Sequence, residues 1–193
     1  MNDLQARLLS LAPPPTRPID AGTPERWGFV ETLIGTVLPR DYKWIINTYG
    51  RGDFCDLLAL LNPFSTSEGG NLLAQIPEVL DHYREGPGFQ VEERRPFPAH
   101  PEPGGLLPAA QDSNGGDLFW RTLGEPDSWA LVHYDWRGGW IHREYGKPLL
   151  DFLVEWISGE LPDGYFGVAN DAPIIRRDPI FLPTGQSRPR LGR

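Results

Sequence analysis

Proline and glycine break this chain into short segments, and no other feature of the sequence limits its fold as strongly. The 193 residues include 22 Gly and 21 Pro, and both residue types end helices and interrupt strands. Each helix or strand must therefore fit between two such breaks. We expect short elements joined by turns, within one domain large enough to bury a core without disulfides or metal.

Apolar residues recur at helical spacing in several of these segments, most of them bounded by a start or stop signal. Pro39 is expected at the first position of one helix, where its missing N–H costs nothing, and Gly50 closes that helix. Pro148 and Gly159 bound the last helix in the same way. The predicted helices span residues 2–12, 24–37, 39–49, 71–84 and 148–158, and three of them have buried faces formed by Trp27, Val30, Ile34 and Val37, by Tyr42, Ile45, Ile46 and Tyr49, and by Leu149, Phe152, Leu153, Trp156 and Ile157.

Extended segments fill the middle of the chain. The apolar run FCDLLALL, residues 54–61, is predicted as one strand. Residues 86–105 are rich in proline and glycine and are predicted as a long loop, with an extended piece at 89–92. This order of helices, then strands, then a helix indicates an α+β fold: a single domain in which helices pack on one side of a largely antiparallel β-sheet. The remaining strands are predicted at residues 105–109, 117–123, 129–134 and 140–146.

Charge is unevenly distributed along the chain. Residues 172–193 contain five arginines and one aspartate, whereas the rest of the chain contains 13 Lys and Arg against 25 Asp and Glu. A body with this excess of acid repels nucleic-acid phosphates and attracts basic proteins, so we expect no direct nucleic-acid binding. Asp3 stands where an export signal carries positive charge, and no apolar run is long enough to span a membrane. A cytoplasmic protein without membrane contact is therefore expected.

A polar segment, DSNGGD at residues 112–117, separates two apolar runs. Its Asn-Gly pair is a strong hairpin signal, and Asp112 and Ser113 are residue types that bond to nearby backbone, so a turn between strands is predicted. A calcium loop would need a ligand where Gly116 stands and a glutamate where Leu123 stands. The spacing of glycine, lysine and hydroxyl that cradles phosphate is also missing.

Residues suited to catalysis are present, but not in a recognised pattern. The single Cys55 has no activating histidine beside it and is expected to be a small buried apolar residue. His133 and Asp135 would share one face of a strand, with Ser113 as a conceivable nucleophile, yet no Gly-x-Ser-x-Gly elbow supports a triad. We expect no catalytic residues, no cofactor and no metal, and keep a hydrolase using His133 and Asp135 as a minor alternative.

Three stretches, in order, resemble the motifs of one protein family. LIGTVLPRDYKWIINTYGRGDF resembles the opening signature of the SUKH superfamily, in which a helix leads through Leu-Pro and an acidic-aromatic pair into a second helix ending at an aromatic-Gly turn. LLPAAQDSNGGDLFW resembles the central motif of the family. DSWALVHYDWRGGWIHREYGKPLLDFLVEWISGEL resembles its closing part, a Trp-led strand followed by a helix with a Phe-Leu core. The resemblance covers about residues 25–160.

The resemblance implies a mostly antiparallel sheet with packed helices and no conserved catalytic apparatus. Bacterial SUKH members are typically immunity proteins that neutralise a toxin, often a nuclease or deaminase of a polymorphic toxin system. Fungal relatives regulate cell-wall synthesis through protein contacts. A monomeric immunity protein with a basic toxin partner is therefore expected, which agrees with the acidic body. The alternative is a regulatory or scaffolding domain that holds an endogenous partner through its arm or its tail.

Domain boundaries and residue roles follow from these expectations. The chain divides into an N-terminal helix and proline-rich arm at 1–23, a SUKH-like domain at 24–160, and a C-terminal extension with a basic tail at 161–193. Structural roles are expected at the motif positions Pro39, Tyr49, Gly50, Asn114, Gly115, Trp129 and Phe152. Partner binding is assigned to acids and aromatics expected at the surface: Asp112, Asp117, Asp135, Trp136, Trp140 and Glu144, with Glu92 and Glu93 on the long loop.

Overall fold

The computed structural model describes residues 2–85, 96–136, 141–161 and 180–186. Within these ranges the chain forms five α-helices, two short 3-10 helices and seven strands. Their order is α1 (Asp3–Leu11), α2 (Pro24–Ile34), α3 (Arg40–Tyr49), β1 (Gly52–Phe54), β2 (Leu58–Leu60), η1 (Glu68–Gly70), α4 (Leu72–Glu85), β3 (Leu106–Asp112), β4 (Asp117–Arg121), η4 (Pro126–Ser128), β5 (Leu131–Asp135), β6 (Ile141–Glu144), α5 (Leu149–Ser158) and β7 (Phe181–Pro183).

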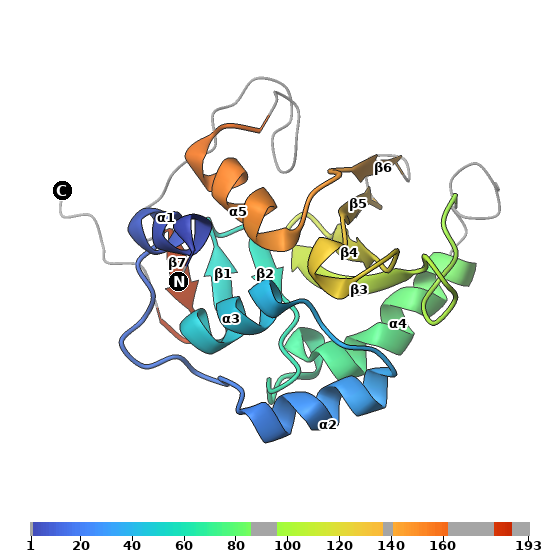
Figure 1. Ribbon diagram of the computed structural model, residues 1–193, viewed down its shortest axis with the longest axis horizontal. Helices are drawn as coiled ribbons and strands as arrows, with labels where there is room; N and C mark the ends of the chain where they lie inside the picture. The colour runs from blue at the N-terminus through green and yellow to red at the C-terminus, as the bar shows by residue number, and fades with distance from the viewer. Residues whose placement is uncertain (1, 86–95, 137–140, 162–179, 187–193) are drawn as a thin grey trace.

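The seven strands form one antiparallel sheet with the order β6-β5-β4-β3-β2-β1-β7 (Figure 1). Strands β1 to β6 pair with their neighbours in sequence, whereas β7 returns from the C-terminal part of the chain to place Phe181 opposite Phe54 of β1. The predicted α+β fold with a largely antiparallel sheet is confirmed. Strand β7 was not predicted, because its three residues are too few to show a periodic pattern.

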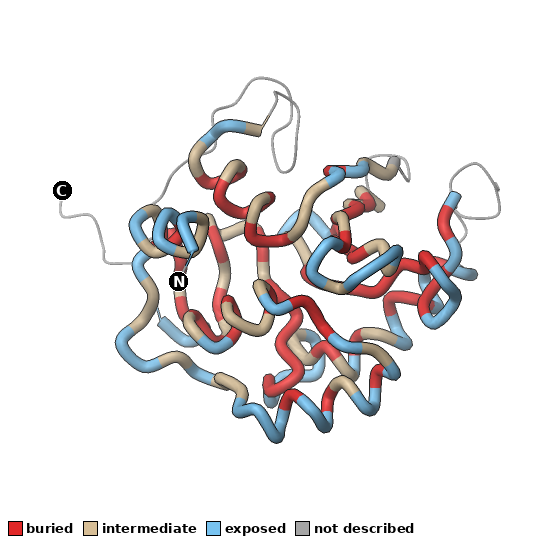
Figure 2. The backbone as a smooth tube through the Cα atoms, viewed as in Figure 1, coloured by how far each residue is buried: buried red, intermediate tan, exposed pale blue. Residues whose placement is uncertain are grey.

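Helices cover both faces of the sheet, so the prediction that they pack on one side is wrong. The larger core joins α1, α2, α3 and α5 to one face, where Leu118 and Trp120 of β4 point. A second core packs Tyr83 of α4 against Phe119 and Tyr134 on the opposite face. Strand β4 is thus buried on both faces (Figure 2), and an unbroken apolar run at residues 118–120 is typical of such strands.

The predicted segment around α3 has the expected buried face and the expected end. Tyr49 is fully buried, and its hydroxyl donates a hydrogen bond to the Ala12 carbonyl at 2.7 Å. Gly50 has a φ of +70°, and a Cβ at this position would lie 2.2 Å from the Ile19 carbonyl oxygen, so no other residue fits. Pro39 is the N-cap of α3, one position before the predicted one.

The predicted single strand at 54–61 is a hairpin instead. The chain reverses between β1 and β2 at Cys55 and Asp56, whose φ angles are +55° and +56°. Aspartate tolerates this conformation, but cysteine seldom adopts it, and the run at 54–61 contains no glycine, proline or asparagine to mark the turn. Cys55 is half-buried at the turn rather than fully buried as predicted.

Segments on both sides of the predicted central domain contribute to the same core. Leu8 and Ala12, in and just after α1, are fully buried, and Ile180 and Phe181 also belong to the core on the α1, α3 and α5 face. The division of the chain at residues 23 and 160 stays a prediction. A test that removes the N-terminal arm would therefore also remove core side chains.

Residues 96–105, the second half of the predicted long loop, contact both α2 and α4 through polar groups of His100. His100 Nε2 lies 3.0 Å from the Ile34 carbonyl oxygen at the end of α2, and Arg84 of α4 donates to the His100 carbonyl at 3.0 Å. The predicted extended piece at 89–92 lies outside the described residues. No helix in the described part of the chain has the length and apolar character needed to cross a bilayer.

Candidate partner-binding surface

The polar segment at 112–117 forms the turn between β3 and β4, as predicted. Gly115 has a φ of +87°, and its N–H donates to the Asp112 carbonyl at 3.0 Å. Asp112 Oδ1 also accepts hydrogen bonds from the backbone N–H groups of Asn114 and Gly116, at 2.7 and 3.1 Å. The Asn-Gly pair and the aspartate therefore build the turn itself, which is the structural role expected for them.

Asp112 also contacts His133 on β5. Its Oδ2 atom lies 2.7 Å from His133 Nε2. Burial opposes ionisation of Asp112, but the hydrogen bonds from His133 and from the turn backbone outweigh it, so the pKa of Asp112 lies below its ordinary value of 3.8. A Cβ at Gly116 would come within 2.4 Å of Oδ2 and 2.6 Å of Nε2. His133 thus helps to hold a turn, and this geometry adds no support for the hydrolase alternative.

Asp117 and Trp136, two predicted partner-binding residues, contact each other inside the domain. Asp117 is only 7% exposed and accepts a hydrogen bond from Trp136 Nε1. Burial raises the pKa of Asp117 above its ordinary value. The Trp136 ring stacks on Tyr134, with ring centroids 5.1 Å apart. Partner binding by Asp112 and Asp117 stays a prediction, but both carboxylates are already held by bonds within the chain.

The other predicted binding residues lie at the β6 edge of the sheet or outside the described residues. Glu144 is exposed and forms an ion pair with Arg121 at 3.3 Å. Asp135 is half-buried at the end of β5. Trp140, Glu92 and Glu93 lie outside the described ranges.

Two further motif positions are buried. Trp129 is 3% exposed, and its Nε1 donates to the Gly124 carbonyl at 3.2 Å. Phe152 of α5 is fully buried against Tyr145, with ring centroids 4.7 Å apart. Both contacts agree with the expected structural roles.

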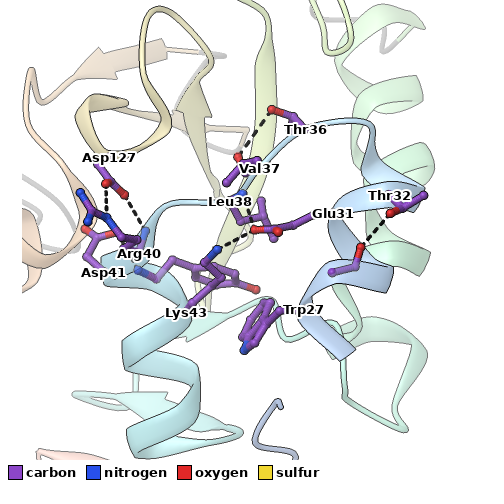
Figure 3. A network of polar contacts seen from close by, with 12 residues as sticks. Trp27, Glu31, Thr32, Thr36, Val37, Leu38, Arg40, Asp41, Lys43 and Asp127 are labelled. Carbon is purple, nitrogen blue, oxygen red and sulfur yellow. Dashed lines mark hydrogen bonds and ion pairs between the residues drawn. The ribbon is translucent and has the colours of Figure 1, made fainter. Parts of the chain in front are cut away.

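A second polar region lies at the corner between α2 and α3, where no binding residue was predicted (Figure 3). Glu31 on α2 accepts hydrogen bonds from the Leu38 N–H at 2.9 Å and from Lys43 Nζ at 2.7 Å. Arg40, at the start of α3, donates from both its backbone and its guanidinium to the Asp127 carboxylate in η4. These bonds fix the connection between α2 and α3 to the body of the domain.

Asp41 connects α3 to α5. Its two oxygens accept hydrogen bonds from the backbone N–H groups of Tyr42 at 2.6 Å and of Leu150 at 3.0 Å. The N-cap of α5 is Pro148, which makes no side-chain capping bond. The first turn of a helix has N–H groups without helical partners, so Asp41 supplies the missing cap from another element.

A cleft of about 450 Å³ opens beside Asp41, where the N-terminal ends of α1, α3 and α5 meet. Arg40, the cation in its lining, is already paired with Asp127. Burial raises the pKa of Asp41, and the negative charges of Asp127 and Asp151 act in the same direction. A guanidinium or ammonium group in this cleft would relieve that repulsion. The cleft is lined by Asn2, Leu4, Gln5, Arg40, Asp41, Asp127, Pro148, Leu150 and Asp151.

The sequence contained one signal for this region, the acidic-aromatic pair Asp41-Tyr42 that follows Leu-Pro. The structure explains the pair, because Asp41 caps α5 and the Tyr42 hydroxyl donates to the Leu61 carbonyl at 2.5 Å. The cleft itself combines residues from three helices and η4, so no local pattern could predict it. Within the described residues, no group of three or more His, Cys, Asp or Glu side chains is arranged to hold a metal ion.

Comparison with known proteins assigns the chain to a family. The family model described as SMI1-KNR4 cell-wall matches residues 24–153, which is more than half of the chain. No curated protein and no solved structure matches the chain. The matched residues include the α2–α3 corner, the β3–β4 turn and the first half of α5. The chain therefore belongs to the SMI1-KNR4 family of the SUKH superfamily.

Proposed function

We propose that this chain is an immunity protein that binds and neutralises the toxin domain of a bacterial polymorphic toxin system, without catalysis of its own. Membership of the SUKH superfamily, whose domains bind partner proteins, carries the proposal. The toxin would be a basic protein that acts on nucleic acid, such as a nuclease.

The charge of the domain supports a basic partner. A nuclease attracts phosphate with exposed lysines and arginines, and an acidic protein that meets this surface associates faster and covers the site. The cleft beside Asp41 would accept one such cation. Asp127 in its lining is paired with Arg40, which leaves the acids Asp41 and Asp151 without a cation in the lining to balance them. Asp135 and Glu144 at the β6 edge remain a second proposed contact.

Co-expression tests this function directly. The full chain is expressed beside the C-terminal toxin domain encoded next to it, and survival of the cells is scored. The purified pair is then titrated by calorimetry at several salt concentrations. Survival with tight binding that weakens as salt rises supports the proposal. Cell death, with a folded chain and an active toxin, contradicts it.

Charge reversal separates the two proposed contacts. We expect Asp151→Lys to slow association more than Glu85→Lys, which makes the same charge change at the exposed end of α4. Asp135→Lys with Glu144→Lys tests the β6 edge in the same way. Equal rates for Asp151→Lys and Glu85→Lys would show that only net charge matters and would remove the cleft from the proposal.

The scaffolding alternative needs a test that spares the core. Deletion of residues 1–23 removes Leu8 and Ala12 and would disturb folding whichever function is correct. Deletion of residues 187–193 removes three arginines and none of the described residues. A scaffold that holds its partner through the tail would lose binding after this deletion, whereas an immunity protein would keep toxin binding.

A further inference from the structure

Helix α2 presents apolar side chains to solvent on its outer side. The described residues include five exposed large hydrophobic side chains, and three of them belong to α2 or to the connection that follows: Phe29 is 65%, Leu33 58% and Val37 55% exposed. Phe29 and Leu33 are four residues apart and therefore share one face of the helix. We call these three residues the α2 stripe.

The α2 stripe is not required to hold the helix in place. The opposite face attaches α2 to the core through Trp27, Val30 and Ile34. Thr23 caps the first turn, and Gly35 ends the helix with a φ of +80°. Side chains on the outer face therefore add little to folding. A cluster of exposed apolar residues without a structural role is typical of a surface that binds another protein.

Val37 was predicted on the buried face of this helix, and the structure shows why it is not. The helix ends at Ile34, and the Leu38 N–H donates to Glu31 at 2.9 Å, which holds the connection against α2 (Figure 3). Leu38 is fully buried as a result, while its neighbour Val37 is exposed. The same bond therefore keeps Val37 on the surface beside the end of α2.

The charges near the stripe favour a basic partner. Arg26 is placed over the Phe64 ring at 4.2 Å and donates to the Ala21 carbonyl, Arg40 is paired with Asp127, and Lys43 with Glu31. Arg40 and Lys43 are thus neutralised by acids of the chain itself, whereas Arg26 adds one exposed positive charge in the first turn of α2. Exposed acids are added by Glu25 in the first turn of α2 and by Glu102 in the loop that meets its last turn.

We infer that the α2 stripe is the apolar centre of the surface that binds the toxin domain, an inference that rests on the function proposed above. The occupant is a basic protein that places aliphatic or aromatic side chains between lysines or arginines. A second copy of this chain fits poorly, because each copy has a formal net charge of −8.

The test replaces the two helical stripe residues. Phe29→Ala with Leu33→Ala keeps a good helix former at both positions, so the circular dichroism spectrum and unfolding midpoint should stay close to those of the unaltered chain. Calorimetry with the toxin domain encoded beside this chain should show binding at least about 30-fold weaker. Leu123→Ala, at a leucine 60% exposed outside the stripe, is the matched control and should change affinity by less than about threefold.

Each outcome has a distinct meaning. If the unaltered chain rescues cells and the double variant binds equally well, the stripe assignment is wrong and the proposed function stands. If Leu123→Ala weakens binding as much as the double variant, the stripe is again not the binding centre. If the unaltered chain neither rescues nor binds, the proposed function fails and the inference falls with it. Self-association that disappears in the double variant would identify a second copy as the occupant and overturn the inference.

Discussion

Replacing Gly116 with alanine tests whether the Asp112–His133 contact holds the β3–β4 turn. The added Cβ would lie 2.4 Å from Asp112 Oδ2, 2.6 Å from His133 Nε2 and 2.7 Å from the Tyr134 carbonyl oxygen. Contacts this short force atoms apart. The two side chains must separate, and β5 must shift slightly from the turn.

The size of the effect follows from these contacts. A hydrogen bond to a charged group contributes about 1.5–3 kcal/mol, and overpacking a filled site costs about 1–3 kcal/mol. Asp112 keeps its bonds to the Asn114 and Gly116 N–H groups, so its carboxylate is not left without partners. We therefore expect the free energy of unfolding to fall by about 2–4 kcal/mol, and the melting temperature by about 4–16 °C in a chain of this length.

Urea unfolding followed by circular dichroism measures this loss. Gly28→Ala is the control, because nothing lies within 4 Å of a Cβ there and alanine is the better helix former. It should raise stability by about 0.5–1 kcal/mol. In an Asp112→Ala background, Gly116→Ala should cost less, since one crowded partner is gone. The proposed crowding is refuted if Gly116→Ala does not lower the free energy of unfolding relative to Gly28→Ala. It is also refuted if Gly116→Ala lowers that free energy equally with and without Asp112.

Three further substitutions test other contacts. The pKa of Asp112 is lower in the folded chain than in the unfolded chain, so the unfolded chain binds a proton first as pH falls. Ionised Asp112 therefore stabilises the fold above its ordinary pKa of 3.8, and this contribution is lost as pH falls further. Asp112→Asn should flatten the decline in unfolding free energy between about pH 5 and pH 2, and an unchanged slope would contradict this. Asp41→Ala removes the cap of α5 and should cost about 1–2 kcal/mol in urea unfolding; a similar loss for Asp151→Ala, which lacks the bond to the Leu150 N–H, would argue against capping. Leu8→Ala should cost about 2–5 kcal/mol, and a loss no greater than that of Leu123→Ala would show that α1 is not part of the core.

The helices were predictable because their signals are local. Tyr42, Ile45, Ile46 and Tyr49 are spaced to share one helix face, and all four are buried. Gly50 and Gly159 end their helices with positive φ angles, as expected for glycine at such positions. Periodicity and stop signals act within a few residues, so they can be read without knowing the rest of the fold.

The strands were harder to predict because their partners are distant in sequence. The hairpin at Cys55 and Asp56 has a single common turn residue, Asp56, and no glycine, proline or asparagine beside it. Strand β7 has three residues and forms only because β1 offers a free edge. Similarly, α4 covers the face opposite to α5, which depends on the path of the whole sheet.

The candidate surface depended most on tertiary structure. Asp112 and Asp117 look like surface acids in the sequence, yet folding brings His133 and Trp136 to their carboxylates. Phe29 looks like a core residue, but the other face of α2 meets the core. A side chain's identity does not specify which face of its element meets the core.

Composition and local patterns were enough to predict the fold class, the family, the acidic body, four of the helix ends at proline or glycine, and the turn at the Asn-Gly pair. All of these depend on composition or on residues close together in the chain. Only the folded chain reveals that Asp41 caps α5, that three helix ends enclose an acidic cleft, and that the α2 stripe is exposed. These features arise from contacts between residues far apart in sequence, which form only when the sheet and its two layers of helices are in place.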